Sequence, residues 1–415
     1  MRPIQLRASL RAHGIAGLLL ATTACGSGFD DAAGNAEQKS GPATLNLLMD
    51  AGGAADLDAV RAATDAWAEK TGNKVNVNPA NDIDQQLSQG FAAGDPPDVF
   101  MVDANKFAAY AEAGNLLPYG DSLSYKDDIY PTLRETFTSD GKFFCAPKDF
   151  STLGLQIRTD AWRQAGLTDA DIPKDWDQLK AVAQRLTTAD RAGLVINDSK
   201  DRVGAFLVQS GGWWVNKDQT QATGDTPENL RALRFVRDLL AGGVAKFPKQ
   251  LGAGDGSEAF GQGKAAMVID GNWMIGSMRE DYPDVKFTVA PLPKGPAGGG
   301  TLSFTQCWGI AAKSEHQEQA KSLVDALMEP KQQLVFAEAF GVMPSRQSVR
   351  AQYEAKFPEK AAFLQGVENA HGPVTAAKMG PVMTDLDNKI QQLPGIDPAQ
   401  VLKEFQQNAT AALGG

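Results

Sequence analysis

Four carboxylates occupy positions where a binding or catalytic group would be useful. Each of them follows a segment that is expected to form a strand; they are Asp50, Asp103, Asp149 and Asp270. Two carboxylates on either side of a glycosidic bond could act as general acid and general base. Carboxylates at strand ends also accept hydrogen bonds from the hydroxyl groups of a ligand. We favour this second interpretation, in which the four aspartates bind rather than catalyse.

Four of the seven tryptophans lie outside the segments expected to be helical: Trp213, Trp214, Trp273 and Trp308. In open α/β sheets, ligands bind beyond the carboxyl ends of the strands. An aromatic face beside carboxylates suits a pyranose, because the C–H face of the sugar packs on the ring while its hydroxyl groups bond to the carboxylates. We therefore predict that these tryptophans contact a carbohydrate; the alternative is that some of them fill the interface between two lobes.

Other kinds of site find little support in the sequence. The three histidines, His13, His316 and His371, do not have metal-ligand spacing, so no metal site is expected. The chain has no Gly-x-Ser-x-Gly elbow and no phosphate-binding loop of the Gly-x-x-x-x-Gly-Lys-Ser/Thr type. The formal charge is −10 without a basic stripe, which argues against nucleic acid as a partner. We expect a binding protein that needs no cofactor.

The first 25 residues have the layout of an export signal. Three arginines precede a short apolar run at 14–21, small residues follow at 22–24, and Cys25 comes next. The apolar run is shorter than the stretch of about 20 residues that spans a bilayer. The arrangement resembles the signal of bacterial lipoproteins, which implies that Cys25 is lipidated, although Thr22 stands where that signal usually has Leu. The alternative is an ordinary signal that is cut near Ala24.

Removal of residues 1–24 makes the chain more acidic. Three of the 40 basic residues and none of the 50 acidic residues are lost, so the formal charge becomes −13. Residues 25–42 are rich in Gly, Ala, Ser, Asp and Asn, and we interpret them as a flexible tether.

The remaining chain alternates strands and helices. Apolar runs and helical spacing predict strands at 44–49, 74–78 and 98–102 and helices at 55–70, 83–93 and 105–113. A second series has strands at 153–158, 265–270, 286–292 and 308–312, and helices at 160–165, 176–186, 228–240, 315–328 and 331–340. Ser314 with Gln317 is expected to cap the helix at 315–328, and residues 353–413 are expected to form several helices. We predict two α/β lobes that are connected by more than one crossing.

Seven short motifs follow one another along residues 44–350. They are DPPDVF at 95–100, EAGNLLP at 112–118, GKFFCAP at 141–147, TD with AGL at 159–167, GKAAM with GNW at 263–273, PLP with WGIA at 291–311, and GVMPS at 341–345. Together they resemble the extracytoplasmic solute-binding proteins of ABC-type importers, in the carbohydrate-binding branch known as family 1. The resemblance is specific because the motifs occur in the order that the family has.

The resemblance implies a fold of two α/β lobes joined by a hinge with several crossings, the type II periplasmic-binding-protein fold. Carried over to this sequence, the first crossing lies near residues 147–150 and the second lies near Pro291. We expect lobe 1 to comprise 43–147 with 290–313, and lobe 2 to comprise 148–289 with 314–415.

The resemblance also implies which residues line the cleft between the lobes. Asp149 falls at the hinge and faces the cleft, and Trp273 matches the tryptophan that the family has there. Arg346 is a candidate hydrogen-bond donor at the cleft edge, with a plain surface arginine as the alternative. The expected ligand-binding residues are Asp50, Asp103, Asp149, Phe150, Trp213, Trp214, Asp270, Asn272, Trp273, Trp308 and Arg346.

Two cysteines remain after Cys25, and their spacing leaves open whether they pair. Cys145 and Cys307 each stand where the resembled family has a glycine, in strands that approach the hinge. The resemblance therefore implies a disulfide between them, which can persist outside the cytoplasm. The alternative is two buried free thiols.

We expect a lipid-anchored substrate-binding subunit of an ABC-type carbohydrate importer, located on the outer face of the cell membrane. It would act as a monomer that closes on a mono- or oligosaccharide and then docks on the membrane permease. Three alternatives remain open: the same fold with a non-sugar solute, a secreted glycosidase, and a structural protein of the envelope.

Overall fold

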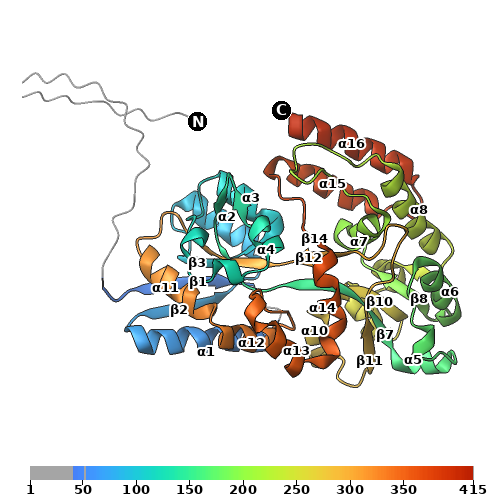
Figure 1. The fold of residues 1–415 in the computed structure, drawn as a ribbon, viewed down its shortest axis with the longest axis horizontal. Coiled ribbons are helices and arrows are strands. Elements are labelled where there is room, and N and C mark those ends of the chain that lie inside the picture. Colours follow the sequence, from blue (N-terminus) through green and yellow to red (C-terminus); the bar gives the residue numbers. More distant parts are fainter. Residues whose placement is uncertain (1–40, 51–52, 415) are drawn as a thin grey trace, which may run out of the picture. The chain divides into compact units, whose positions relative to one another are not determined.

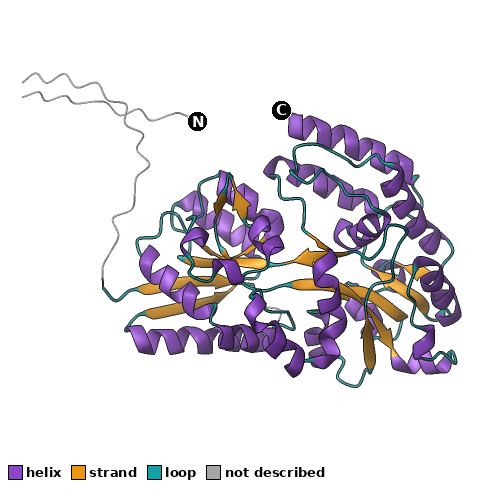
Figure 2. Cartoon of the chain, viewed as in Figure 1, coloured by secondary structure: helices purple, strands orange, loops and turns teal. Residues whose placement is uncertain are grey.

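The computed structural model describes residues 41–50 and 53–414. The predicted signal peptide, Cys25 and the tether up to residue 40 lie outside the described residues. The described chain belongs to one compact unit. Two large sheets with helices against them organise it (Figure 2).

The first sheet has the strand order β2-β1-β3-β13-β6. Its strands are β1 (Thr44–Met49), β2 (Lys74–Pro79), β3 (Val99–Asp103), β6 (Ala146–Pro147) and β13 (Gln306–Ile310). β1 pairs in parallel with β2 and β3, whereas β13 is antiparallel to β3 and β6. The helices that follow the first three strands are α1 (Ala54–Thr71), α2 (Ile83–Ala93) and α3 (Ala104–Glu112). The predicted parallel α/β unit is confirmed in this part of the chain.

The second sheet has the strand order β14-β12-β7-β10-β8-β9, and β11 pairs with β7. Its strands are β7 (Ser151–Arg158), β8 (Ala192–Ile196), β9 (Ala245–Lys246), β10 (Ala265–Gly271), β11 (Phe287–Ala290), β12 (Thr301–Phe304) and β14 (Ala370–His371). Every residue of β8 and β10 is buried, which is typical of strands that are covered on both faces.

Eight helices accompany the second sheet in the described chain. They are α5 (Thr159–Gln164), α6 (Trp176–Leu186), α7 (Lys200–Ser210), α8 (Pro227–Ala241), α9 (Gly256–Gly261), α10 (Met274–Asp281), α15 (Gly380–Ile390) and α16 (Pro398–Gly414). Figure 1 shows α15 and α16 next to α7 and α8, which brings the end of the chain against this sheet's helices.

Helix α6 illustrates how the local sequence sets an element. The carboxylate of Asp175 accepts a hydrogen bond from the backbone N–H of Gln178 (2.8 Å), which caps the first turn. Trp176, Leu179 and Leu186 are buried along one face, as an amphipathic helix requires. The helix predicted at 176–186 is therefore confirmed to the residue.

The predicted helix at 315–328 is shorter in the structure, where α11 (Gln317–Leu327) begins directly after His316. The Ser314 hydroxyl accepts a hydrogen bond from the backbone N–H of His316 (3.1 Å) and donates to the carboxylate of Asp98 (2.6 Å). The Gln317 amide donates to the carbonyl of Ala312 (2.8 Å). Ser314 therefore takes part in the hydrogen bonds at the start of the helix and also bonds to a residue remote in the sequence.

Three segments connect the two sheets. The first comprises residues 148–150, between β6 and β7, and the second is Thr305, between β12 and β13. The third leads from α12 (Pro330–Ala339) through α13 (Arg350–Lys356) and α14 (Ala361–Gly366) to β14. Helix α14 lies beside β7 in Figure 1 and contacts it.

The predicted second crossing near Pro291 is wrong. After β11 the chain stays beside the second sheet, where the backbone N–H of Lys294 donates to the carbonyl of Lys174 (2.9 Å). Strand β12 then pairs with β7 before the chain crosses at Thr305. Prolines 291 and 293 lack the N–H that would extend β11, so the strand ends there although the chain does not leave this sheet.

The predicted assignment of all of 314–415 to lobe 2 is also wrong. Helices α11 and α12 pack on α1, and Leu323, Leu327 and Phe336 are buried in the core of the first sheet. The indole N–H of Trp67 on α1 donates to Ser322 on α11 (3.1 Å). The apolar stripes of α11 and α12 are thus buried in the first core, whereas those of α15 and α16 are buried in the second core.

Cys145 and Cys307 form a disulfide, with their Cα atoms 5.7 Å apart, so the predicted pairing is confirmed. It links the residue that directly precedes β6 to β13, at the first-sheet ends of two connecting segments. The backbone N–H of Lys148 also donates to the carbonyl of Gln306 (2.7 Å), and the Thr305 hydroxyl donates to the carbonyl of Asp149 (2.7 Å). The first two connections therefore leave the first sheet from a common base.

The disulfide is expected to contribute substantially to stability. It closes a loop with a sequence separation of 162, for which the chain-entropy model gives about 5 kcal/mol. We expect the double variant Cys145→Ala/Cys307→Ala to lose roughly 3–5 kcal/mol of unfolding free energy, measured by urea denaturation without reductant. Dithiothreitol should destabilise the wild type and leave the double variant unchanged; an equal response of both proteins would contradict the assignment.

Lys360 predicts an unusual pH dependence of stability. Its side chain is 4% exposed, and its ammonium meets the Ala337 carbonyl (3.4 Å) and the ring of Phe357 (4.4 Å). Burial lowers its pKa to about 8, so the folded state holds fewer protons than the unfolded state between about pH 8 and 10.4. Lysine 360 therefore destabilises the fold below pH 8, and this penalty disappears as the pH rises.

We expect Lys360→Met to be more stable than the wild type at pH 7 by about 1–2 kcal/mol. The difference should shrink between pH 8 and pH 10, because the wild type gains stability there and the variant does not. Urea denaturation of both proteins at several pH values measures this, and parallel stability curves would contradict it.

Candidate functional site

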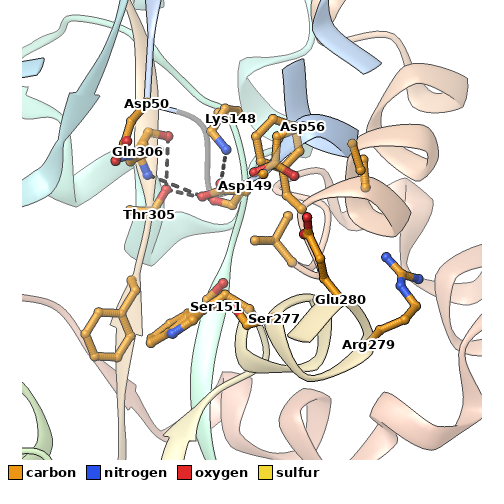
Figure 3. A pocket seen from close by; sticks show the side chains of 18 of the residues that line it. Asp50, Asp56, Lys148, Asp149, Ser151, Ser277, Arg279, Glu280, Thr305 and Gln306 are labelled. Atoms are coloured by element: carbon orange, nitrogen blue, oxygen red, sulfur yellow. Dashed lines mark hydrogen bonds and ion pairs between the residues drawn. The ribbon is translucent and has the colours of Figure 1, made fainter. Parts of the chain in front are cut away.

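A cavity of about 690 Å³ lies where the connecting segments meet the ends of both sheets (Figure 3). Its lining includes the end of β1, the end of β3, the start of α1, helix α10 and the end of α12. The residues are Asp50, Gly53, Ala55, Asp56, Asp103, Lys148, Asp149, Ser151, Trp273, Gly276, Ser277, Arg279, Glu280, Asp281, Phe304, Thr305, Gln306, Ala339, Phe340 and Val342. We call this the main cavity.

The main cavity is built around a buried ion pair. The ammonium of Lys148 binds the carboxylate of Asp149, and both side chains are under a tenth exposed. The other carboxylate oxygen of Asp149 accepts a hydrogen bond from the backbone N–H of Gln306 (3.3 Å). The Lys148 ammonium also lies over the ring of Phe340, 4.0 Å from its centre. The carboxylate is thereby fixed between two connecting segments, as the dashed lines in Figure 3 show.

Asp103 stands at the junction of three cavities. It ends β3 opposite Gln306 of β13, and its carboxylate caps α3 by accepting from the backbone N–H (2.8 Å) and the side-chain amide (2.9 Å) of Asn105. Burial raises the pKa of this carboxyl, and the neighbouring Asp201 and Asp84 raise it further, against the lowering effect of the two Asn105 hydrogen bonds. Asp103 is therefore a carboxyl of raised pKa at the place where the three cavities meet.

Two further cavities adjoin the main cavity at Asp103. One, of about 630 Å³, also shares Asp50 and Gln306 with it. The other is a narrow chamber of about 30 Å³, which shares Phe304 and Thr305 with the main cavity. We refer to it as the side chamber.

An aromatic wall closes one side of the main cavity. The rings of Trp273 and Phe304 meet edge to face with their centres 5.0 Å apart. The guanidinium of Arg202 lies 5.1 Å from the centre of the Trp273 ring and 5.3 Å from that of Phe304. Trp273 follows the end of β10, and Phe304 ends β12, so this wall belongs to the second sheet.

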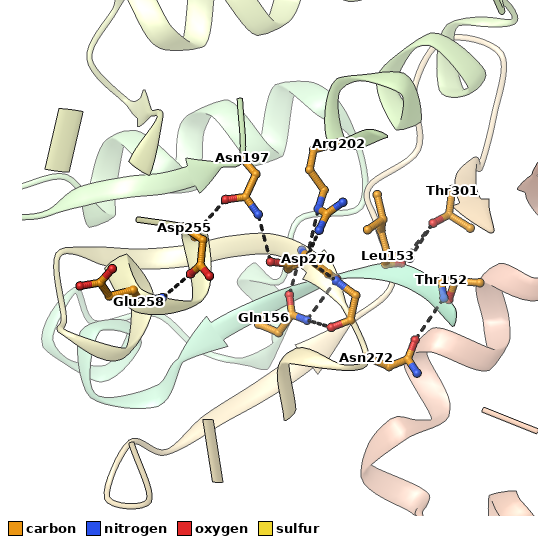
Figure 4. Close-up of polar contacts among 12 residues, drawn as sticks. Thr152, Leu153, Gln156, Asn197, Arg202, Asp255, Glu258, Asp270, Asn272 and Thr301 are labelled. Carbon is orange, nitrogen blue, oxygen red and sulfur yellow. Dashed lines mark hydrogen bonds and ion pairs between the residues drawn. The ribbon is translucent and has the colours of Figure 1, made fainter. Parts of the chain in front are cut away.

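Asp270 supports the aromatic wall instead of lining the main cavity. Its carboxylate accepts from Arg202 (2.7 and 3.1 Å), from the Asn197 amide (3.2 Å) and from the backbone N–H of Gly271 (2.8 Å), as Figure 4 shows. The carboxylate thus holds the guanidinium that lies against both rings. Its expected direct contact with a ligand is corrected to this indirect role.

The structure brings four predicted residues together in the main cavity: Asp50, Asp103, Asp149 and Trp273. Trp213 and Trp214 instead line the side chamber. Trp214 is 1% exposed and packs on Phe405, so most of its ring belongs to the second core.

Four other predicted residues line none of these three cavities. Phe150 packs on Tyr130, and Trp308 is buried next to Phe336. Asn272 and Arg346 form hydrogen bonds with residues outside these cavities. We therefore correct the expectation of ligand contact for Phe150, Asn272, Trp308 and Arg346.

Asn272 and Arg346 have structural partners. The Asn272 amide accepts from the backbone N–H of Thr152 (3.1 Å, Figure 4) and donates to the carbonyl of Gly341 (3.0 Å), which ties β7 to the segment after α12. Arg346 donates to the carboxylate of Asp128 (2.7 Å) and lies over the ring of Tyr125. The polar groups of both side chains are therefore engaged in contacts within the fold.

Sequence reasoning missed several residues of the main cavity. Lys148 is adjacent to the predicted Asp149, and Thr305 and Gln306 lie shortly before the predicted strand at 308–312, so neighbouring residues indicated their place. Ser277, Arg279 and Glu280 gave none, because α10 was not predicted.

Residues 41–50 and 53–414 contain no group of three or more His, Cys, Asp or Glu side chains that could hold a metal ion. Within the same ranges, no helix is long and apolar enough to cross a membrane.

Comparison with known proteins identifies the fold and the family. Residues 51–334 match the family model described as bacterial extracellular solute-binding protein. The diacetylchitobiose binding protein of Streptomyces coelicolor is 24% identical over 367 residues, which cover 86% of each chain. The maltotriose-binding protein of Pyrococcus abyssi is 23% identical over 360 residues, covering 80% of this chain and 74% of that protein.

Solved structures show the same fold. An ABC substrate-binding protein from Listeria monocytogenes in complex with cycloalternan superposes with a TM-score of 0.80 at 21% identity, covering 90% of this chain and all of that one. The maltotriose binding protein of Thermus thermophilus gives a TM-score of 0.75 at 22% identity, covering 89% of this chain and all of that one. The predicted two-lobed α/β fold is confirmed, and because the family model spans more than half of the sequence, the chain belongs to the family of bacterial extracellular solute-binding proteins.

Proposed function

We propose that this protein is the substrate-binding subunit of an ABC-type carbohydrate importer, which captures a mono- or oligosaccharide in the main cavity and delivers it to a membrane permease. The observation that carries this proposal is the combination of an aromatic wall, Trp273 with Phe304, and fixed carboxylates, Asp103 and Asp149, in one cavity of about 690 Å³. That size lies within the range of roughly 300–1,000 Å³ that is usual for small-molecule sites.

A carbohydrate matches this combination better than other solutes do. Its C–H faces can pack on the aromatic wall, and its hydroxyl groups can donate to carboxylates that the protein already holds in place. Relatives of the chain are named for binding diacetylchitobiose, lactose and maltotriose, which supports the same class of ligand here.

The mechanism follows from where the cavity lies. Its lining comes from both sheets and from the segments between them, so a bound sugar would contact both lobes. A ligand that contacts both lobes favours the closed arrangement over the open one, because only there are all its contacts made. Bending would take place beyond the disulfide, since the first two connecting segments leave the first sheet from a common base.

We assign the carboxylates to binding and not to catalysis. Asp149 is neutralised by Lys148 and held by Gln306, which suits a fixed acceptor more than a nucleophile or a proton donor. The family supports this view, since its members bind solutes. No cofactor is needed for this function.

Membrane attachment through Cys25 and a monomeric state complete the proposal. The cysteine lies outside the described residues, and the lipid would hold the receptor on the outer face of the membrane. A tether raises the effective concentration of the receptor at its permease.

A panel of mono- and oligosaccharides, screened by thermal shift, tests the proposed function. We expect at least one sugar to raise the melting temperature, since binding to the folded state alone stabilises it. Trp273→Phe should weaken that sugar's binding about tenfold in calorimetry, because a smaller ring covers less of the sugar face. Trp176→Phe, which changes a tryptophan outside the three cavities, should bind normally. A stabilising solute of another class, with no active sugar, would refute the proposal.

The charge of the main cavity predicts discrimination against acidic sugars. Six carboxylates line it, and only two cations do: Lys148, which is already paired, and Arg279. We expect the uronic acid counterpart of the preferred sugar to bind roughly tenfold more weakly at low salt, with a smaller difference at high salt. The neutral methyl ester of that uronic acid should regain most of the affinity. Equal binding of the acid and the neutral sugar would contradict this reading of the site.

A further inference from the structure

We infer that the sugar bound in the main cavity carries a primary ammonium group, which binds to acceptors at the edge of the first sheet. This inference rests on the proposed carbohydrate function and narrows its ligand to an amino sugar. The acceptors are the carboxylates of Asp50 and Asp103 and the side-chain amide of Gln306. All three residues line both the main cavity and the cavity of about 630 Å³ beside it. We call them the acceptor row.

The topology of the first sheet brings the acceptor row together. β1 and β3 are parallel neighbours, so Asp50, which directly follows β1, and Asp103, which ends β3, lie at the same edge. Gln306 begins the antiparallel strand β13 directly opposite Asp103. Neighbouring strands are about 4.8 Å apart, so the three side chains start from adjacent positions. Because one sheet carries all three residues, movement of the lobes does not separate them.

Most of the hydrogen-bonding capacity of the acceptor row is unused by the protein. Among residues 41–50 and 53–414, the Asp50 carboxylate and the side-chain amide of Gln306 have no hydrogen-bond or ion-pair partner. The Asp103 carboxylate accepts only from Asn105, and through one of its two oxygens. The row therefore keeps free acceptors that face a cavity.

The lysines near the acceptor row are already paired with other carboxylates. In the cavity of about 630 Å³, the ammonium of Lys106 lies 3.1 Å from Asp84, and that of Lys200 lies 2.8 Å from Asp201. In the main cavity, Lys148 belongs to the ion pair at its centre. None of these lysines is free to neutralise the row.

Arg279, the other cation of the main cavity, comes from the opposite sheet. It lies on α10, and it acts on Glu338 of α12: the hydrogen bond from Lys356 lowers the pKa of Glu338, and the charge of Arg279 lowers it further. Arg279 thus belongs to the α12 side of the cavity. The positive charge that the acceptor row lacks is left for the ligand to supply.

A primary ammonium matches the acceptor row in both charge and geometry. It has three N–H donors, and two carboxylates with an amide oxygen offer three acceptors. Hydrogen bonds between charged partners are also the stronger kind. Burial raises the pKa of Asp103, and a bound cation would offset this cost of its charge.

A metal ion fits the acceptor row less well than an ammonium does. Ca²⁺ takes about six to eight oxygen ligands, and the row offers fewer. The described ranges of the chain hold no group of three or more His, Cys, Asp or Glu side chains that could bind a metal ion. An organic cation is therefore the better match.

Ser151 points to a ligand in the same cavity by a separate observation. It begins β7, is 3% exposed and lines the main cavity, and its hydroxyl has no hydrogen-bond partner in the part of the chain that the structure describes. The hydroxyl is not one of the groups that are closed off from solvent, and in Figure 3 it is directed into the cavity. A hydroxyl group of the sugar would supply its partner.

An amino sugar therefore makes different contacts with the two sheets. Its ammonium binds the acceptor row of the first sheet, while its ring face packs on Trp273 and a hydroxyl group meets Ser151, both beside the second sheet. Neither sheet alone offers the full set.

Sugars that differ in one substituent test the inference by calorimetry at pH 6, where a primary amine is protonated. Glucose, glucosamine and N-acetylglucosamine carry a hydroxyl, an ammonium and a neutral acetamido group at the same carbon. The galactose series and the disaccharides cellobiose, chitobiose and N,N′-diacetylchitobiose follow the same scheme, and 6-amino-6-deoxyglucose moves the ammonium to another carbon. In at least one series we expect the ammonium member to bind at least tenfold more tightly than the neutral members, with a smaller preference at high salt.

Asp50→Asn tests the acceptor row itself, because it removes one charge and keeps the size of the side chain. We expect the preference for the ammonium sugar over its hydroxyl counterpart to fall about tenfold. Asp58→Asn is the matched control: Asp58 is an exposed residue of α1 that lines none of the three cavities, and its substitution changes the net charge equally. The control should keep the preference. Equal effects of the two variants would overturn the inference, since the row would then act only through the net charge.

The outcomes separate this inference from the proposed function. If a neutral sugar binds as tightly as its ammonium counterparts, the carbohydrate function stands and the inference is overturned. If no sugar binds, the carbohydrate function fails, and the acceptor row is judged with the diamine putrescine. Putrescine binding that Asp50→Asn weakens and Asp58→Asn does not would support an ammonium site for a different amine. Absence of putrescine binding would overturn the ammonium site as well.

Discussion

The buried ion pair between Lys148 and Asp149 is the interaction on which the rest of the site depends. Two charges removed from water are tolerated only with a close partner and further hydrogen bonds. Here the partners come from other segments: Gln306 donates to Asp149, Gln333 donates to the carbonyl of Lys148 (2.9 Å), and Phe340 lies under the ammonium. The pair therefore holds the connecting segments together, next to the disulfide, and places a carboxylate between the two sheets.

The second sheet contributes the aromatic side chains of the site, and a buried ion pair holds them in place there as well. Asp270 is 2% exposed and holds Arg202, whose guanidinium lies against Trp273 and Phe304. A buried carboxylate thus positions an aromatic wall without touching the cavity. The first sheet contributes Asp50 and Asp103, and the second sheet contributes the rings of Trp273 and Phe304, so a ligand gains its full set of contacts only when it meets both. This division explains how binding can be coupled to the arrangement of the lobes.

Much of the fold could be predicted from the sequence where local patterns are strong. The helix at 176–186 and the strand at 44–49 have the predicted bounds, because a cap with an apolar stripe and a short apolar run are local signals. β12, α7 and α10 were missed, since their burial comes from distant partners such as β7 and α8. Of the residues that line the main cavity, Asp50, Asp103, Asp149 and Trp273 were predicted. Asn272 and Arg346 were misjudged, because the groups that occupy them, Gly341 and Asp128, are remote in the sequence.

The sequence by itself determined the α/β character and the family, because these follow from local periodicity and short motifs. It also determined that the site uses carboxylates and tryptophan. Only the tertiary structure decided which members of each type share a cavity. Trp308 and Trp273 look alike in the sequence, yet one is enclosed by the first core and the other lines the main cavity. The tertiary structure also decided that the chain crosses at Thr305 and not at Pro291. Strand pairing and burial depend on contacts between residues far apart in the chain, which no local pattern records.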